Sequence, residues 1–74
     1  MADINSDDHI MVGKLGRCTG RIAPGHTGEV SVEVRGGVEG FLAHSTDNEE
    51  VIERNDRVVI VEYFPPRTVY VSKA

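Results

Sequence analysis

The 74-residue sequence lacks several features, and each absence excludes a class of protein. Its one cysteine, Cys18, rules out an intrachain disulfide and a cysteine-based zinc site. Tryptophan is absent, and there are only two phenylalanines and two tyrosines, so the core must consist mainly of valine and isoleucine. The longest apolar run, Val58–Val61, is far shorter than the roughly 20 residues that a membrane-spanning helix needs.

The length allows one domain, because a second core would need roughly 50 residues of its own. Residues 1–9 contain three aspartates and no periodic apolar pattern, which predicts a disordered acidic leader. The remaining residues, 10–74, are expected to form the domain. The leader has neither the basic nor the apolar stretch of a signal peptide, so the chain as given is expected to be soluble and cytoplasmic.

The net charge is −4, from 8 basic and 12 acidic residues. Much of the negative charge lies in the leader and in residues 47–56. Nucleic-acid binders usually carry a concentrated basic face, because neutralisation of phosphates supplies most of their non-specific affinity. The charge pattern therefore argues against a general nucleic-acid binder.

Glycines and alternating valines define the first half of the domain. Three glycines within Ile10–Ala23 predict a long, bent strand with bulges, followed by a turn at Ala23–Gly28. Polar residues and valines alternate in Glu29–Arg35, which predicts a half-buried antiparallel strand. Gly36-Gly37 is expected to form a two-residue hairpin turn. The inward-facing residues of this strand would be Val30, Val32 and Val34.

The next segment, Val38–His44, does not alternate cleanly. A bulge at Gly40 would reverse which of the following residues face inward. With that bulge, Val38, Phe41 and Ala43 would all point into the core, and we adopt this interpretation.

The second half is expected to add two strands. Ser45–Asn48 is a predicted loop, Glu49–Arg54 has room for at most one helical turn, and Asn55 suits a left-handed backbone. A β-branched run, Arg57–Phe64, predicts a strand that is buried on much of both faces. Pro65-Pro66 would end it, because proline cannot donate to a ladder, and the final strand would be Arg67–Ser72.

Five short strands without a substantial helix favour a closed barrel, because closure leaves no exposed sheet edge. The predicted fold class is all-β, a small five-stranded Greek-key barrel of the OB type, in which a long first strand bends to serve both halves. An SH3-like barrel is the alternative that the sequence leaves open.

Several short motifs, taken in order, resemble one known family. They are Val12-Gly13-Lys14-Leu15-Gly16-Arg17, a turn at Pro24, an alternating valine strand, Phe41-Leu42-Ala43, Ile52-x-x-Asn55-x-x-Val58-x-Ile60-Val61 and Val69-x-Val71. This order is similar to the C-terminal soluble domain of NfeD-like proteins and covers Val12–Val71. Asn55 stands where the family pattern has glycine, which is tolerable because asparagine also visits the left-handed region. The membrane-spanning segments that precede this domain in the family are missing from the sequence.

The resemblance implies a non-catalytic module. NfeD-like domains are carried by membrane proteins, are often encoded with stomatin- or flotillin-like partners, and are thought to mediate assembly at the membrane. The chain would then be a protein-interaction module, either the soluble portion of a membrane protein or a shortened free-standing member of the family. A single-stranded nucleic-acid-binding OB domain is the alternative function.

Two residue sets are candidates for binding. Aromatic residues beside two prolines at a loop tip are a common way to present a contact to another protein, although they can equally fold back over the barrel mouth. For nucleic acid, basic residues would have to combine with an aromatic stacking platform. The candidate interaction surface is Tyr63, Phe64, Pro65, Pro66 and Arg67. The alternative nucleic-acid face is Lys14, Arg17, Arg21, Arg35 and Tyr70.

No residue pattern predicts catalysis, a cofactor or a metal. The sequence His44-Ser45-x-Asp47 contains the residue types of a catalytic triad, but neighbours in sequence rarely adopt triad geometry, so we interpret them as loop residues. Cys18 is interpreted as a small buried hydrophobe. The histidines His9, His26 and His44 lack ligands at metal spacing, and the acidic residues Glu49, Glu50 and Glu53 read as a solvated loop.

Overall fold

The computed structural model of the chain describes residues 11–34, 36–47 and 49–74. The acidic leader predicted for residues 1–9, with His9, lies outside the described residues. The described chain forms five strands, which are β1 (Leu15–Gly20), β2 (Gly28–Val34), β3 (Gly37–Ser45), β4 (Arg57–Phe64) and β5 (Thr68–Lys73).

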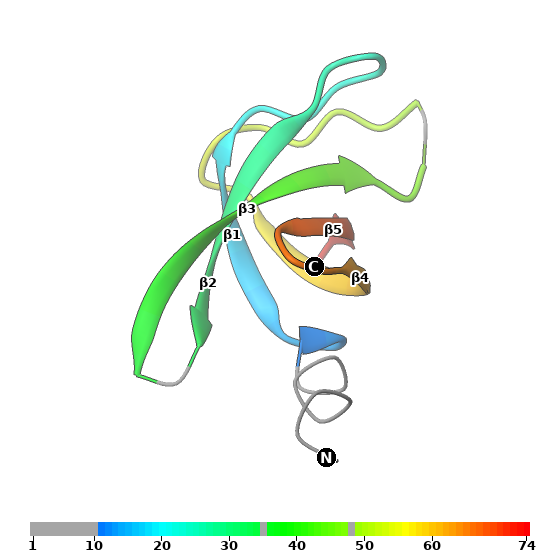
Figure 1. Ribbon diagram of the computed structural model, residues 1–74. Helices are drawn as coiled ribbons and strands as arrows, with labels where there is room; N and C mark the ends of the chain where they lie inside the picture. The colour runs from blue at the N-terminus through cyan, green and yellow to red at the C-terminus, as the bar shows by residue number, and fades with distance from the viewer. Residues whose placement is uncertain (1–10, 35, 48) are drawn as a thin grey trace.

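The five strands close into a barrel in the order β1-β2-β3-β5-β4 (Figure 1). Strand β1 pairs with β2 on one side and with β4 on the other, which closes the ring. Neighbouring strands are antiparallel except β3 and β5, which are parallel. An all-β OB-like barrel, with β1 serving both halves, is therefore confirmed as the fold class.

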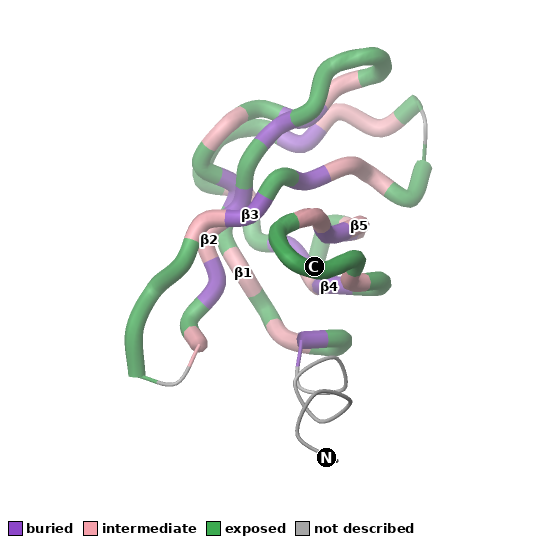
Figure 2. The backbone as a smooth tube through the Cα atoms, viewed as in Figure 1, coloured by how far each residue is buried: buried purple, intermediate pink, exposed green. Residues whose placement is uncertain are grey.

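All five strands contribute buried side chains to the core, and most of these are small and aliphatic. Figure 2 marks the buried residues along the backbone. The scarcity of aromatics thus has the expected consequence, since valine and isoleucine supply most of the core. Among the described residues, no polar or charged residue is buried. The core consists of Met11, Cys18, Ile22, Val30, Val32, Phe41, Ala43, Ile52, Val58, Ile60, Val69 and Val71.

The first strand is shorter than its glycine-rich sequence predicts, but it bends as expected. Its pairing with β2 shifts register between Cys18 and Gly20. Beyond β1, Ile22 forms an isolated antiparallel bridge with Ile52, which joins the end of this segment to the connection before β4. Strand β2 begins at Gly28, where a side chain would collide with the carbonyl oxygen of Gly20. Glycine is therefore required where the two segments cross.

The β2–β3 hairpin confirms one prediction and corrects two. Val32 is 1% exposed, and the inward alternation of β2 is as expected. However, Val34 pairs with Gly37, so Gly37 belongs to β3 and not to the turn as predicted. The register of β2 with β3 continues without a bulge at Gly40, and Val38 points outward with 71% exposure. The hairpin extends beyond the barrel (Figure 1), and without a bulge Val38 lies on the face opposite to Phe41, which is the outer face.

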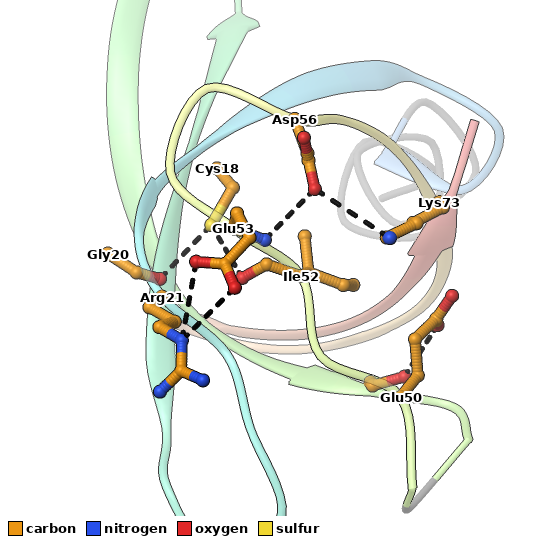
Figure 3. Close-up of polar contacts among 9 residues, drawn as sticks. Cys18, Gly20, Arg21, Glu50, Ile52, Glu53, Asp56 and Lys73 are labelled. Atoms are coloured by element: carbon orange, nitrogen blue, oxygen red, sulfur yellow. Dashed lines mark hydrogen bonds and ion pairs between the residues drawn. The ribbon is translucent and has the colours of Figure 1, made fainter.

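The connection from β3 to β4 is a loop held by short polar contacts, and its described residues form no helical turn. Asn55 has the predicted left-handed conformation, with φ of +80°. The amide of Glu53 donates to Oδ2 of Asp56 at 2.9 Å, and Lys73 lies 3.9 Å from the same oxygen (Figure 3). These contacts fix the approach to β4.

Strand β4 has the predicted bounds but not the predicted two-sided burial. Its pairing with β5 shifts register between Ile60 and Glu62, and Val61 is 41% exposed. The irregularity changes which residues face inward. Before it, Ile60 points into the core, and after it, Tyr63 packs against the core. The expectation of burial on both faces is wrong, because in a barrel this small the outer face of β4 is open to solvent.

Candidate interaction surface

The predicted interaction segment is divided between the two faces of the barrel. Tyr63 packs against the core, where its ring meets Phe41 edge to face with centroids 6.1 Å apart. Its hydroxyl donates to the carbonyl oxygen of Pro66 at 3.2 Å. Tyr63 thus folds back over the end of the barrel, which is the arrangement that the sequence left open as the alternative to a projecting contact.

Phe64 instead points outward and is 49% exposed. Its ring meets that of Tyr70 on β5 edge to face, with centroids 5.5 Å apart. On the other side, Tyr70 stacks against the ring of His44 on β3 at 5.0 Å. Three rings from three neighbouring strands therefore form one row on the outside of the barrel.

The strand register extends this row. Thr68 of β5 pairs with Leu42 of β3 on one side and with Phe64 of β4 on the other. Leu42 is 53% exposed and follows the inward-facing Phe41, so it shares the outer face with the rings. We call this set of four residues the aromatic surface: Leu42, His44, Phe64 and Tyr70.

The turn between β4 and β5 is fastened to β3 by Arg67. Its Nη1 donates to the carbonyl oxygen of Gly40 at 2.9 Å and lies 3.8 Å from a carboxylate oxygen of Glu39. The guanidinium carbon is also 5.9 Å from the centre of the Phe41 ring. Pro65 and Pro66 are exposed at the tip of this turn. Arg67 therefore orders the turn beside the aromatic surface.

The residues of the alternative nucleic-acid face are dispersed. Arg17 is on β1, where it pairs with Ser31 and Arg57, whereas Tyr70 is on β5, which is not adjacent to β1. Arg21 is engaged with Glu53, with Nε 3.3 Å from a carboxylate oxygen (Figure 3). Lys14 is half-buried just before β1, and Arg35 lies outside the described residues. The barrel therefore does not place Tyr70 beside Arg17, the basic residue of β1.

Cys18 is a buried hydrophobe, as predicted. Its side chain is fully buried, and Sγ lies 3.1 Å from the carbonyl oxygen of Gly20 and 3.7 Å from that of Ile52 (Figure 3). Burial raises the pKa of the Cys18 thiol, and the carboxylates of Asp56 and Glu53 add to the rise. A protonated, enclosed thiol is a poor nucleophile.

The histidine, serine and aspartate of the triad-like sequence make separate contacts. The Ser45 hydroxyl donates to Oε1 of Glu50 at 3.0 Å and accepts the backbone N–H of Asp47. His44 stacks on Tyr70. Among the residues that the structure describes, no three histidine, cysteine or acidic side chains are grouped to hold a metal ion. The serine proton is thus directed at a glutamate in a loop turn, away from any histidine base.

Leu42 and His44 are functional candidates that the sequence analysis did not select. Their place on the outer face could have been predicted, because both alternate with Phe41 and Ala43 in the sequence. Their contact with Tyr70 could not, because Tyr70 belongs to a strand that pairs with β3 only in the folded barrel. The described part of the chain contains no helix that is long and apolar enough to cross a membrane.

Comparison with known proteins identifies the barrel. It is similar to the C-terminal domain of stomatin operon partner protein 1510-C from Pyrococcus horikoshii (27% identity, TM-score 0.72, 90% of this chain and 92% of that one). It is also similar to the soluble domain of the NfeD protein YuaF from Bacillus subtilis (26% identity, TM-score 0.75, 93% and 79%). A third structure shares the fold at 18% identity and a TM-score of 0.73, with 90% and 98% covered. It is the soluble domain of a Corynebacterium glutamicum membrane protein implicated in regulation of membrane protease activity.

No curated protein matches the chain. The family model for the NfeD C-terminal domain, however, matches residues 15–72, which include all but the last residue of the five strands. The chain therefore belongs to the NfeD C-terminal domain family, and the family resemblance of its sequence motifs is confirmed.

Proposed function

We propose that this chain is a non-catalytic protein-interaction module of membrane-associated assemblies and that it binds a stomatin- or flotillin-like protein through the aromatic surface. Membership of the NfeD C-terminal domain family supports the membrane setting, as does the description of one similar structure as the soluble domain of an NfeD protein. The description of another as a stomatin operon partner supports the partner class.

The observation that carries this proposal is the exposure of apolar side chains that the fold does not need. Phe64 and Leu42 are 49% and 53% exposed, although the barrel closes without them. Aromatic residues with one face packed and another open to solvent are typical anchors at protein interfaces. The ring row is also rigid, because Tyr70 is held between Phe64 and His44. A preordered surface loses little side-chain entropy on binding.

The contacts of the polar side chains support a non-catalytic role. Catalysis by serine or cysteine usually pairs the nucleophile with a histidine base that a third group orients. The Ser45 hydroxyl instead donates to Glu50 within a loop turn, and Cys18 is buried and protonated. The serine of the triad-like sequence and the single cysteine are thus each engaged structurally.

A titration followed by NMR tests the proposal. The ¹⁵N-labelled chain is mixed with the soluble portion of a stomatin-like protein of the same organism, and in parallel with mixed single-stranded DNA and RNA at low salt. We expect the protein to shift the amide signals of Leu42, His44, Phe64 and Tyr70, and the oligonucleotides to shift none.

The opposite result would overturn the proposal. Salt-sensitive shifts at Lys14, Arg17 and Arg21 on addition of oligonucleotide, with none at the aromatic surface on addition of protein, would favour the nucleic-acid-binding alternative.

A further inference from the structure

A second surface of the barrel carries two facing positive charges. Arg17 of β1 is the direct register partner of Arg57 of β4, and both are exposed on the outer face. Like charges directly opposite each other in an antiparallel pair are destabilising. The fold therefore retains an arrangement that costs stability and makes no contribution to the core.

Neither of these two arginines is engaged in an ion pair among the described residues. Arg21, Arg67 and Lys73 each lie within 4 Å of a carboxylate oxygen. In the same described part of the chain, neither Arg17 nor Arg57 has a carboxylate within ion-pair distance. Their positive charge is thus free to act on a ligand.

A groove of about 360 Å³ lies beside this pair on the outside of the barrel. Leu15 and Val38 line it and are 59% and 71% exposed, the two most exposed large apolar side chains described. Ser31 lies in the groove next to Arg17, its register partner. One end of the groove is thus basic, and Leu15 and Val38 give it an apolar part.

We propose that this groove binds an acidic segment of a protein partner. A carboxylate of the segment lies between the guanidinium groups of Arg17 and Arg57, and a neighbouring apolar side chain of the segment rests between Leu15 and Val38. Carboxylate is the natural counter-ion for a pair of guanidinium groups, because each can donate two parallel hydrogen bonds to it. Binding would also relieve the repulsion between the two arginines.

The composition of the groove favours a protein segment over a nucleic acid. Glu33 is part of the lining and would repel a run of phosphates, whereas a single carboxylate can sit next to the arginines. The lining contains no aromatic ring on which a base could stack. Exposed Leu15 and Val38 instead match an apolar side chain.

The acidic-segment groove goes beyond the proposed function, because it is a separate site. The aromatic surface is centred on β5, whereas the groove is centred on β1 and β2, and neither of these strands is adjacent to β5 in the ring. A barrel with both surfaces could hold two segments at once.

Fluorescence anisotropy with defined peptides tests the groove. The probe is a labelled eight-residue peptide with one central glutamate next to a leucine and otherwise serine and glycine, and its control has glutamine in place of the glutamate. We expect saturable binding of the acidic peptide only. Arg17→Gln and Arg57→Gln should each weaken it at least roughly tenfold, since each removes a charged hydrogen-bond partner.

Matched variants separate this site from general electrostatics and from the aromatic surface. Arg54→Gln removes an exposed positive charge outside the groove, and Phe64→Ala removes a ring of the aromatic surface; both should leave the affinity within about twofold. Leu15→Ser should weaken binding without changing its dependence on salt. Equal binding of the glutamine peptide, no saturable binding at millimolar peptide, or an equal loss in Arg54→Gln would each overturn the proposal. Tighter binding of mixed single-stranded DNA, lost in Arg17→Gln, would overturn it in favour of nucleic acid.

Discussion

Tyr63 and Phe64 are adjacent in the chain and lie on opposite faces of β4, so that one ring closes the end of the core and the other is offered to solvent. Tyr63→Ala should therefore lower the free energy of unfolding by about 1–3 kcal/mol, because it removes a half-buried ring and its edge-to-face contact with Phe41. Phe64→Ala should cost at most about 1 kcal/mol. Urea titration of both variants measures the difference, and a larger loss for Phe64→Ala would contradict the assigned faces.

Val32→Asp should unfold the domain, whereas Glu33→Lys should leave its stability nearly unchanged. Val32 is at the centre of the inward face of β2 and is 1% exposed. Burying an unpaired carboxylate costs several kcal/mol or forces it to take up a proton. A domain of this size has only about 3–5 kcal/mol of stability in total. Glu33 is exposed, where a substitution usually changes stability by less than about 0.5 kcal/mol. Thermal melts compare the two, and the reverse order of stability would mean that the strand register is shifted by one residue.

Gly28→Ala should destabilise the barrel much more than Gly37→Ala. At Gly28 an added methyl group would collide with the carbonyl oxygen of Gly20 and lie 2.6 Å from that of Arg21, and both are backbone atoms that cannot move aside cheaply. We expect a loss of about 1–3 kcal/mol. At Gly37 the nearest atom is 3.9 Å away, and the backbone is not left-handed there. Chemical denaturation of the pair measures this difference, and equal losses would show that β1 and β2 do not approach as closely as described.

Cys18 should make the stability of the domain depend on pH in the alkaline range. Burial raises its pKa in the folded state, so above the ordinary thiol pKa of about 8.5 the unfolded chain loses its proton first. The free energy of unfolding should then fall as the pH rises, by up to about 1.4 kcal/mol per pH unit until the folded-state pKa is reached. Cys18→Ala should lack this contribution at every pH.

Denaturation of both proteins between pH 7 and pH 10 isolates the thiol, because all other titrating groups are shared. Parallel profiles would contradict the buried, protonated thiol. A thiol reagent such as Ellman's should also label the wild-type chain only after unfolding.

The fold could be predicted largely from local patterns, but not where a strand carries an apolar residue on its outer face. The alternation in β2 specified its inward face, and Pro65-Pro66 marked the end of β4. The apolar character of Val38 predicts an inward position, because an apolar residue in a strand usually faces the core. It is exposed because β3 keeps its alternation through Gly40, and this register with β2 places Val38 on the face opposite to Phe41.

The candidate surface was harder to predict, because its members meet only through long-range pairing. In the sequence, Phe64 and Tyr70 belong to different candidate sets, and His44 is a candidate only for catalysis or metal binding. The parallel pairing of β3 with β5 sets His44 opposite Tyr70, and no local pattern encodes that pairing. The irregularity between Ile60 and Glu62 likewise determines that Phe64, rather than Tyr63, faces outward.

The most direct test of the interaction surface is the affinity of wild-type and Phe64→Ala chains for the soluble portion of a stomatin-like protein of the same organism, measured by calorimetry. Val12→Ala is the matched control, because Val12 is also 49% exposed but precedes β1, away from the aromatic surface. We predict a loss of at least roughly tenfold for Phe64→Ala, as expected for an aromatic anchor, and less than about twofold for Val12→Ala. Equal affinities of all three chains, or no binding by the wild-type chain, would contradict the account.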